Sequence, residues 1–205
     1  MSKAVLISIR PEWCEKIVNG EKTIEVRKTR PKLETPFKCY IYCTKGYLSY
    51  PVGNGMVCHL NGGMEVIGEF VCCDIHHYKS EFWDDETHEQ ILDEYEPADF
   101  NEYGEYEYAT IAENGEENWL CKKSCLSWDE LRKYVGAGIR DFYGWHISDL
   151  VIYDKPMALS EFKPWNRTEC FYSDLGLAIP KCSECHTCKV ERPPQSWCYV
   201  EVLHG

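Results

Sequence analysis

Residues Gly20–Arg27 read Gly-Glu-Lys-Thr-Ile-Glu-Val-Arg, and the rest of the chain is interpreted outward from this stretch. Its last five residues alternate between polar and aliphatic side chains, which is typical of a strand. The alternation places Thr23, Glu25 and Arg27 on one face of that strand. Lys22 stands at its start, directly after a glycine turn. We expect this polar face to be the working surface of the protein.

The residue types on this face suit a phosphate or a nucleobase. Arginine and lysine donate hydrogen bonds to phosphate and carboxylate groups. Glu25 can accept from an amino group on a base or orient Arg27, and Arg10 adds a cation at the end of the preceding strand. The alternative is an exposed strand face that carries a solvated ion pair.

The remaining patterns predict a soluble α+β protein of 205 residues in one domain, 1–205. Strands are expected at 5–9, 23–27, 37–43, 66–75, 144–153 and 196–202. Helices are expected at 11–19, which Gly20 ends, and at 127–135, where Ser127 and Glu130 form a capping box. Residues 80–120 read as an acidic insertion, with one helix over 87–95.

Charge is distributed unevenly along the chain. The net charge is −12, but residues 1–60 hold ten Lys and Arg against five Asp and Glu. Residues 81–117 hold fifteen Asp and Glu and no Lys or Arg. The basic N-terminal third therefore remains compatible with an anionic ligand. No apolar run reaches the roughly 18 residues of a membrane helix, and the start of the chain shows no signal peptide, so we expect a cytoplasmic protein.

Aromatic residues are expected to extend the binding surface. Tyr40 and Tyr42 share a face of the strand at 37–43, which we place beside the motif strand, and Lys45 follows them. Aromatic faces next to cations suit base stacking, whereas packing in the core or at its rim is the alternative. The histidines His76, His77 and His146 are interpreted as surface or hydrogen-bonded strand residues.

A cysteine-rich loop, 164–195, predicts a structural zinc site. Two-residue spacing lets neighbouring thiolates face one metal ion, and three thiols show it: Cys182, Cys185 and Cys188. Cys170 is the first choice as fourth ligand, with His186 and Cys198 as the alternatives. Unliganded thiols are the competing interpretation, and an iron–sulfur motif would need a Cys-Pro that is missing here. Thirteen cysteines, an odd number, fit a reduced protein better than a disulfide framework.

The motif, together with residues 7–11 and 17–19 before it, resembles the signature of the ASCH domain family in the PUA-like superfamily. Residues 144–150 and 192–201 resemble a branch of that family associated with phages and prophages. The resemblance implies a mostly antiparallel β-barrel with peripheral helices. It does not extend over the acidic insertion.

The resemblance also implies a cleft floored by the Lys-Thr-x-Glu-x-Arg strand that binds RNA or a nucleotide. Some members are RNA-processing enzymes, and one branch hydrolyses N4-acylated cytidine with a lysine and, three residues later, a threonine nucleophile. Lys22 matches that lysine, but Glu25 stands at the threonine position, and Thr23 shares its face. The alternatives are thus a ribonuclease or nucleoside hydrolase using Lys22, Thr23 and Glu25, or a phage-encoded inhibitor module that presents the acidic segment.

The zinc site leads to a first prediction. Purified full-length protein, prepared without chelator, should contain about one zinc in a closed four-ligand site in its cysteine-rich loop. Cys185→Ser should lower the unfolding temperature and leave RNA affinity nearly unchanged, because the metal closes a loop that has little core of its own. Elemental analysis and thermal unfolding are the measurements. Unchanged zinc content and an unchanged unfolding temperature in Cys185→Ser would contradict the site.

Overall fold

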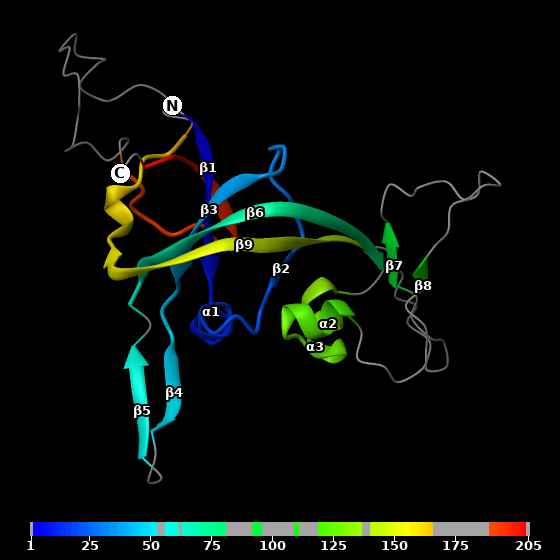
Figure 1. Ribbon diagram of the computed structural model, residues 1–205, viewed down its shortest axis with the longest axis horizontal. Helices are drawn as coiled ribbons and strands as arrows, with labels where there is room; N and C mark the ends of the chain where they lie inside the picture. The colour runs from blue at the N-terminus through cyan, green and yellow to red at the C-terminus, as the bar shows by residue number, and fades with distance from the viewer. Residues whose placement is uncertain are drawn as a thin grey trace. The chain divides into compact units, whose positions relative to one another are not determined.

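The computed structural model describes residues 2–52, 56–61, 63–80, 92–95, 109–110, 119–136, 140–165 and 189–203 (Figure 1). The chain divides into two compact units. The first unit comprises Met1–Val18, Phe37–Val71 and Asp149–Gly205, and the second comprises Asn19–Pro36 and Cys72–Ser148. Two long strands, β6 and β9, contribute residues to both units. The single domain stays a prediction.

Most of the expected elements are present, several with longer bounds. The strands are β1 (Lys3–Ile9), β2 (Ile24–Arg27), β3 (Phe37–Cys43), β4 (Tyr47–Val52), β5 (Met56–Asn61), β6 (Glu65–Ser80), β7 (Leu92–Tyr95), β8 (Ala109–Thr110), β9 (Arg140–Met157) and β10 (Trp197–Glu201). The helices are α1 (Pro11–Val18), α2 (Trp119–Ser124), α3 (Trp128–Val135) and the 3-10 turn η1 (Leu159–Glu161).

The first unit is built around β1. This strand pairs in parallel with β3 and antiparallel with β10, so the sheet is mixed. Six of the seven residues of β1 are buried, as expected for a strand covered on both faces. A core cluster contains Leu6 of β1, Tyr40 of β3 and Val200 of β10, and Phe162 packs edge-on against Tyr40 with ring centroids 4.9 Å apart.

The second unit holds the motif strand. β2 pairs antiparallel with β9, and the register places Ile24 opposite His146 and Glu25 opposite Trp145. Helices α2 and α3 cover the aliphatic side of this ladder. Ile24 and Val26 share a core cluster with side chains of both helices: Leu120, Leu131 and Val135.

Local signals explain where the helices begin and end. The Ser127 hydroxyl accepts from the backbone N–H of Glu130, and the Glu130 carboxylate accepts from the N–H of Ser127, which completes the predicted capping box. Gly136 ends α3 with a φ of 94°. Gly20, with a φ of 74°, follows α1, in keeping with its predicted role as helix stop.

Two sequence predictions differ from the structure, and two of its features were not predicted. Residues 92–95 form β7, paired with the end of β6, so the helix expected over 87–95 is wrong there; residues 87–91 lie outside the described part. The strand at 37–43 does not neighbour the motif strand, since β2 pairs with β9 whereas β3 pairs with β1 and β6. The β4–β5 hairpin and α2 were not predicted.

Two further features bear on the predicted class. The parallel β1–β3 pair makes the α+β sheet mixed, and its closure into a barrel stays a prediction. Among the described residues, no helix is long and apolar enough to cross a membrane.

The packing of the second unit predicts that Gly144→Ala destabilises the protein. A Cβ at this position would lie 3.0 Å from Ile24 Cγ2 and 3.1 Å from Tyr78 Cε2, inside the core under α2. Overpacking of this kind costs about 1–3 kcal/mol, which urea unfolding would measure. Val151→Ala, at a position on the same strand that is 50% exposed, is the control and should change stability by less than about 0.5 kcal/mol. Equal stability of the two variants would refute this reading of the core.

Candidate functional site

The motif strand β2 is short and is held by backbone contacts at its start. The N–H of Thr23 donates to the carbonyl of Lys123 at the end of α2, at 2.9 Å, and the carbonyl of Thr23 accepts from the N–H of Ile147 at 3.0 Å. These bonds connect the beginning of the motif to a helix on one side and to β9 on the other. The side chains that follow are thereby placed with little freedom.

Glu25 lies between two cations. Its Oε1 is 2.9 Å from Arg27 Nη2, and its Oε2 is 3.3 Å from Lys22 Nζ. Lys22 Nζ also donates to the carbonyl of Ser124 at 2.7 Å. The three charged side chains are 2%, 8% and 9% exposed for Lys22, Glu25 and Arg27. The alternative of a solvated ion pair is therefore wrong, because these charges lie inside the unit.

The buried network, Lys22–Glu25–Arg27, carries more positive than negative formal charge. Removing ions from water is costly unless they are paired and hydrogen-bonded. Glu25 pairs with both cations here, in a medium that screens charge weakly. The two cations would interact favourably with an anionic group nearby.

An aromatic ring that was not predicted lies next to this network. Tyr134 of α3 is 37% exposed, and Lys28 Nζ lies 5.4 Å from the centre of its ring. Burial raises the pKa of Tyr134. The nearby charge of Arg27 lowers this pKa, and that of Glu25 raises it. The capping box predicted the helix, but sequence does not show that its last turn packs beside the motif.

The other predicted binding residues lie in the first unit. Tyr40 is fully buried and Tyr42 is 3% exposed, so neither ring offers a face to a base in this structure. The Tyr40 hydroxyl accepts from the N–H of Leu203 at 2.9 Å. Arg10 is exposed and lies 3.8 Å from Glu12, and Lys45 is also exposed.

The predicted zinc ligands Cys170, Cys182, Cys185 and Cys188 lie outside the described residues, as does His186. The other alternative ligand, Cys198, sits on β10, opposite Leu6 of β1. Burial raises the pKa of its thiol to about 11, which opposes the thiolate that a metal requires.

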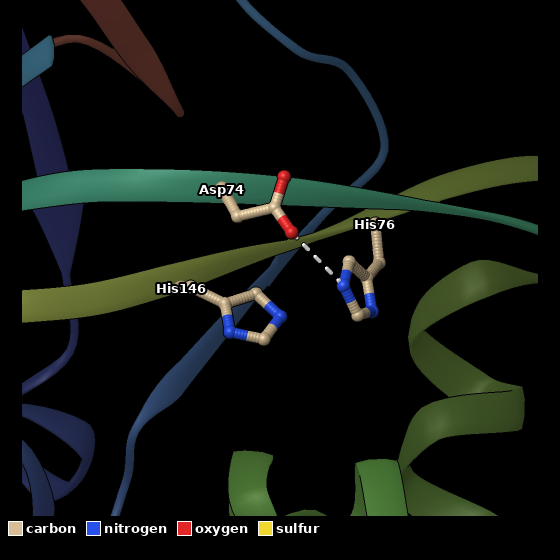
Figure 2. Close-up of side chains that lie close together, drawn as sticks. All are labelled: Asp74, His76 and His146. Atoms are coloured by element: carbon tan, nitrogen blue, oxygen red, sulfur yellow. Dashed lines mark ion pairs between the residues drawn. The ribbon is translucent and has the colours of Figure 1, made fainter. Parts of the chain in front are cut away.

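A second polar cluster lies on β6 and β9. Asp74, His76 and His146 offer ligand atoms that all lie within 4.8 Å of one another (Figure 2). Sequence reasoning treated the histidines separately, since nothing in the sequence pairs residue 76 with residue 146. The Trp119 ring stacks on His76 with centroids 5.9 Å apart.

Comparison with known proteins identifies the family. The ASCH domain model matches residues 7–123, which include α1, the whole motif and all but the last residue of α2. The chain belongs to the ASCH domain family. No curated protein matches it significantly in sequence. The expected association with a phage branch of the family stays a prediction.

Solved structures of an ASCH protein from Zymomonas mobilis are similar to this chain. A point mutant of that protein is 18% identical, with a TM-score of 0.49, over 98% of this chain and 91% of the other. The unmutated protein is 17% identical, with a TM-score of 0.44, over 97% of this chain and 87% of the other.

The buried network predicts that Glu25→Gln destabilises this ASCH domain strongly. Two buried cations would lose their negative partner, which costs about 3–5 kcal/mol in comparable cases. Replacing all three charges by apolar residues, as in Lys22→Met with Glu25→Leu and Arg27→Met, should recover most of that loss. Glu12→Gln, at an exposed pair, is the control and should stay within about 0.5 kcal/mol of wild type in urea unfolding. Equal effects of Glu25→Gln and Glu12→Gln would show that the network is not buried in solution.

Proposed function

We propose that this ASCH domain binds RNA or a nucleotide at a surface formed by β2 and α3. The observation that carries the proposal is that the two buried cations of the Lys22–Glu25–Arg27 network lie beside the exposed ring of Tyr134. The family supports the same ligand class. In the proposed arrangement the network provides the local field, and more exposed groups make the direct contacts.

The network suits this role because its geometry exists before any ligand arrives. Arg27 and Lys22 are held by Glu25, and Lys22 is also held by a helix carbonyl, so the cations need little rearrangement on binding. Their charge reaches a ligand through protein rather than water, where screening is weaker. Buried cations alone do not contact phosphates, so exposed partners are needed.

Exposed groups on the same elements can make those contacts. Tyr134 offers an aromatic face for a base, and Lys28 next to it offers a cation for a phosphate. Further exposed cations lie in the same unit, on the segment after β2 and on the two helices: Arg30, Lys122, Arg132 and Lys133. Arg10 and Lys45 lie in the first unit and stay separate predictions.

The second candidate is an enzyme, either a ribonuclease or a hydrolase of a modified nucleoside resembling the N4-acylcytidine amidohydrolases. It is favoured by the placement of Lys22, whose Nζ lies within reach of a carboxylate and a carbonyl in a buried site next to Thr23. The two acceptors suit an electrostatic role for Lys22, with the half-buried Thr23 hydroxyl as nucleophile. Release of acetate from N4-acetylcytidine, or shortening of single-stranded RNA, would support it.

A third candidate is an interaction module in which the acidic segment occupies a basic site. Salt separates it from a binder, because a single-stranded RNA complex weakens with salt according to the number of phosphate contacts. A protein whose own acidic segment blocks the site would bind RNA weakly at every salt concentration and gain affinity when residues 81–117 are removed.

The proposal predicts how variants of the exposed contacts bind RNA. Tyr134→Ala should weaken single-stranded RNA binding by about 5- to 150-fold, because stacking is worth about 1–3 kcal/mol per base. Tyr134→Phe should bind nearly as wild type, since the ring remains. Lys28→Ala should reduce the slope of log affinity against log salt by about 1, the contribution of one phosphate contact. Fluorescence anisotropy at two or more salt concentrations is the measurement.

Lys155→Ala serves as the matched control for charge. Lys155 is exposed on the first-unit part of β9, away in sequence from the motif and from α3, and its loss should leave the salt slope unchanged. Equal affinities for wild type, Tyr134→Ala and Lys28→Ala would remove the proposed surface. A fall in all four variants, Lys155→Ala included, would indicate diffuse charge attraction instead.

A further inference from the structure

The cluster of Asp74, His76 and His146 has no part in the proposed RNA surface. We propose that these three side chains bind one divalent transition-metal ion, with zinc as the ion to test. This site is separate from the zinc site predicted for the cysteine-rich loop. Neither the motif nor the family match assigns it.

The backbone holds the three side chains toward a common point. Asp74 and His76 are two residues apart on β6, so they project from the same face of the strand. His146 comes from β9, which pairs with β6. Tyr78 is two residues from His76 on β6, and Gly144 is two residues from His146 on β9. These two residues meet in the core, where a Cβ on Gly144 would lie 3.1 Å from the tyrosine ring. The packed core therefore fixes the strands next to the cluster.

The distances are close to those of a metal site. Asp74 Oδ2 lies 3.1 Å from His76 Nε2 (Figure 2). Two ligands bound tetrahedrally at about 2.0–2.1 Å from zinc lie about 3.3 Å apart. The three ligand atoms lie within 4.8 Å of one another, so their largest separation must shorten by at most roughly 1.5 Å to reach that value. The Asp74–His76 pair already has this separation, so any remaining closure is toward His146.

Neighbouring groups orient the ligands. Asp74 Oδ1 accepts from the N–H of Ile75 at 2.8 Å, which leaves Oδ2 directed to His76. Trp119 stacks on His76 at an interplanar angle of 23° and is tilted against His146, with ring centroids 5.9 Å apart in each case. Supporting contacts of this kind restrict imidazole rotation and tune metal affinity. α2 thus covers one side of the cluster.

The ligand set selects the class of ion. Two imidazoles and one carboxylate suit zinc, iron(II) and their neighbours, whereas magnesium and calcium prefer oxygen ligands. The two histidine rings lie 4.4 Å apart between centroids, close enough for one ion to be shared between them. Three protein ligands leave a position for water or a ligand atom, as in open zinc sites.

The alternative is an ordinary ion pair between Asp74 and a protonated His76, with His146 as a packing neighbour. The chain offers a matched example of such a pair. His77 Nε2 lies 2.9 Å from Asp141 Oδ1, and its ring stacks on Tyr143 at 4.8 Å. His77 is adjacent to His76 but projects from the opposite face of β6. Among the described residues it belongs to no cluster of three such ligand atoms, so it serves as a control that shares the residue types of the Asp74–His76 pair.

The experiment is a zinc titration of the full-length protein after chelator treatment and dialysis, followed by calorimetry. It is run in wild type and in Cys185→Ser, so that the cysteine-rich loop is accounted for. In both backgrounds, Asp74→Asn and His146→Gln should lose one zinc per chain or weaken it at least tenfold, since even loss of a supporting contact costs about 10- to 100-fold. His77→Gln should retain wild-type binding.

A second measurement distinguishes this site from thiolate ligation. Cobalt(II) bound in the Cys185→Ser background should show the spectrum of nitrogen and oxygen ligation, and Asp74→Asn should abolish it. Asp74 is exposed, so this variant should unfold at the wild-type temperature in the absence of metal. Equal zinc binding by wild type, Asp74→Asn and His146→Gln would overturn the site, and so would equal losses in these variants and in His77→Gln.

Discussion

The second unit depends on the ion contacts of Glu25. A strand of four residues has few backbone hydrogen bonds, and β2 carries two charges and aliphatic side chains that are all buried. A lone buried arginine or lysine would oppose folding. The carboxylate between Lys22 and Arg27 removes that opposition, and the bond from Lys22 to the Ser124 carbonyl extends the contact to the end of α2. The charged residues therefore also position a helix.

This dual character explains why so polar a segment can be internal. Replacing a buried ion network by apolar residues often stabilises a protein, so its presence points to a requirement other than stability. In the proposed RNA surface, two buried cations lie beside an exposed tyrosine and lysine, which would satisfy such a requirement. In that proposal the groups that touch the ligand and the groups that create the local field are different residues, and only the former are exposed.

The two sides of the β2–β9 ladder have different characters. The register places Glu25 opposite Trp145 and Ile24 opposite His146. Glu25 and His146 therefore project from opposite faces of the β2–β9 ladder. Near Val26 the face that carries His146 is an apolar core, and toward Asp74 it becomes polar. Trp119 spans that change, since its neighbour Leu120 lies in the core while its own ring covers the imidazoles.

Local patterns were sufficient for several elements. The capping box at Ser127, the glycine after α1 and the alternation of β2 rest on interactions between residues a few positions apart, which a sequence displays directly. The motif residues and the family were also readable, because the Lys-Thr-x-Glu-x-Arg spacing is contiguous. Short α2 was missed because its single turn and a half has too few residues for a clear period, and its position depends on packing over Ile24.

By itself, the sequence determined the type of most strands and helices, the chemistry of the motif and membership of the ASCH family. Tertiary structure decided which strand pairs with the motif strand, that its charges are buried, that Tyr134 is a ring next to it, and that His76 meets His146. The physical reason is that burial and pairing depend on contacts between residues far apart in the chain. Alternation shows that two residues share a face, but only the packed partner shows whether that face meets water, a helix or another charge.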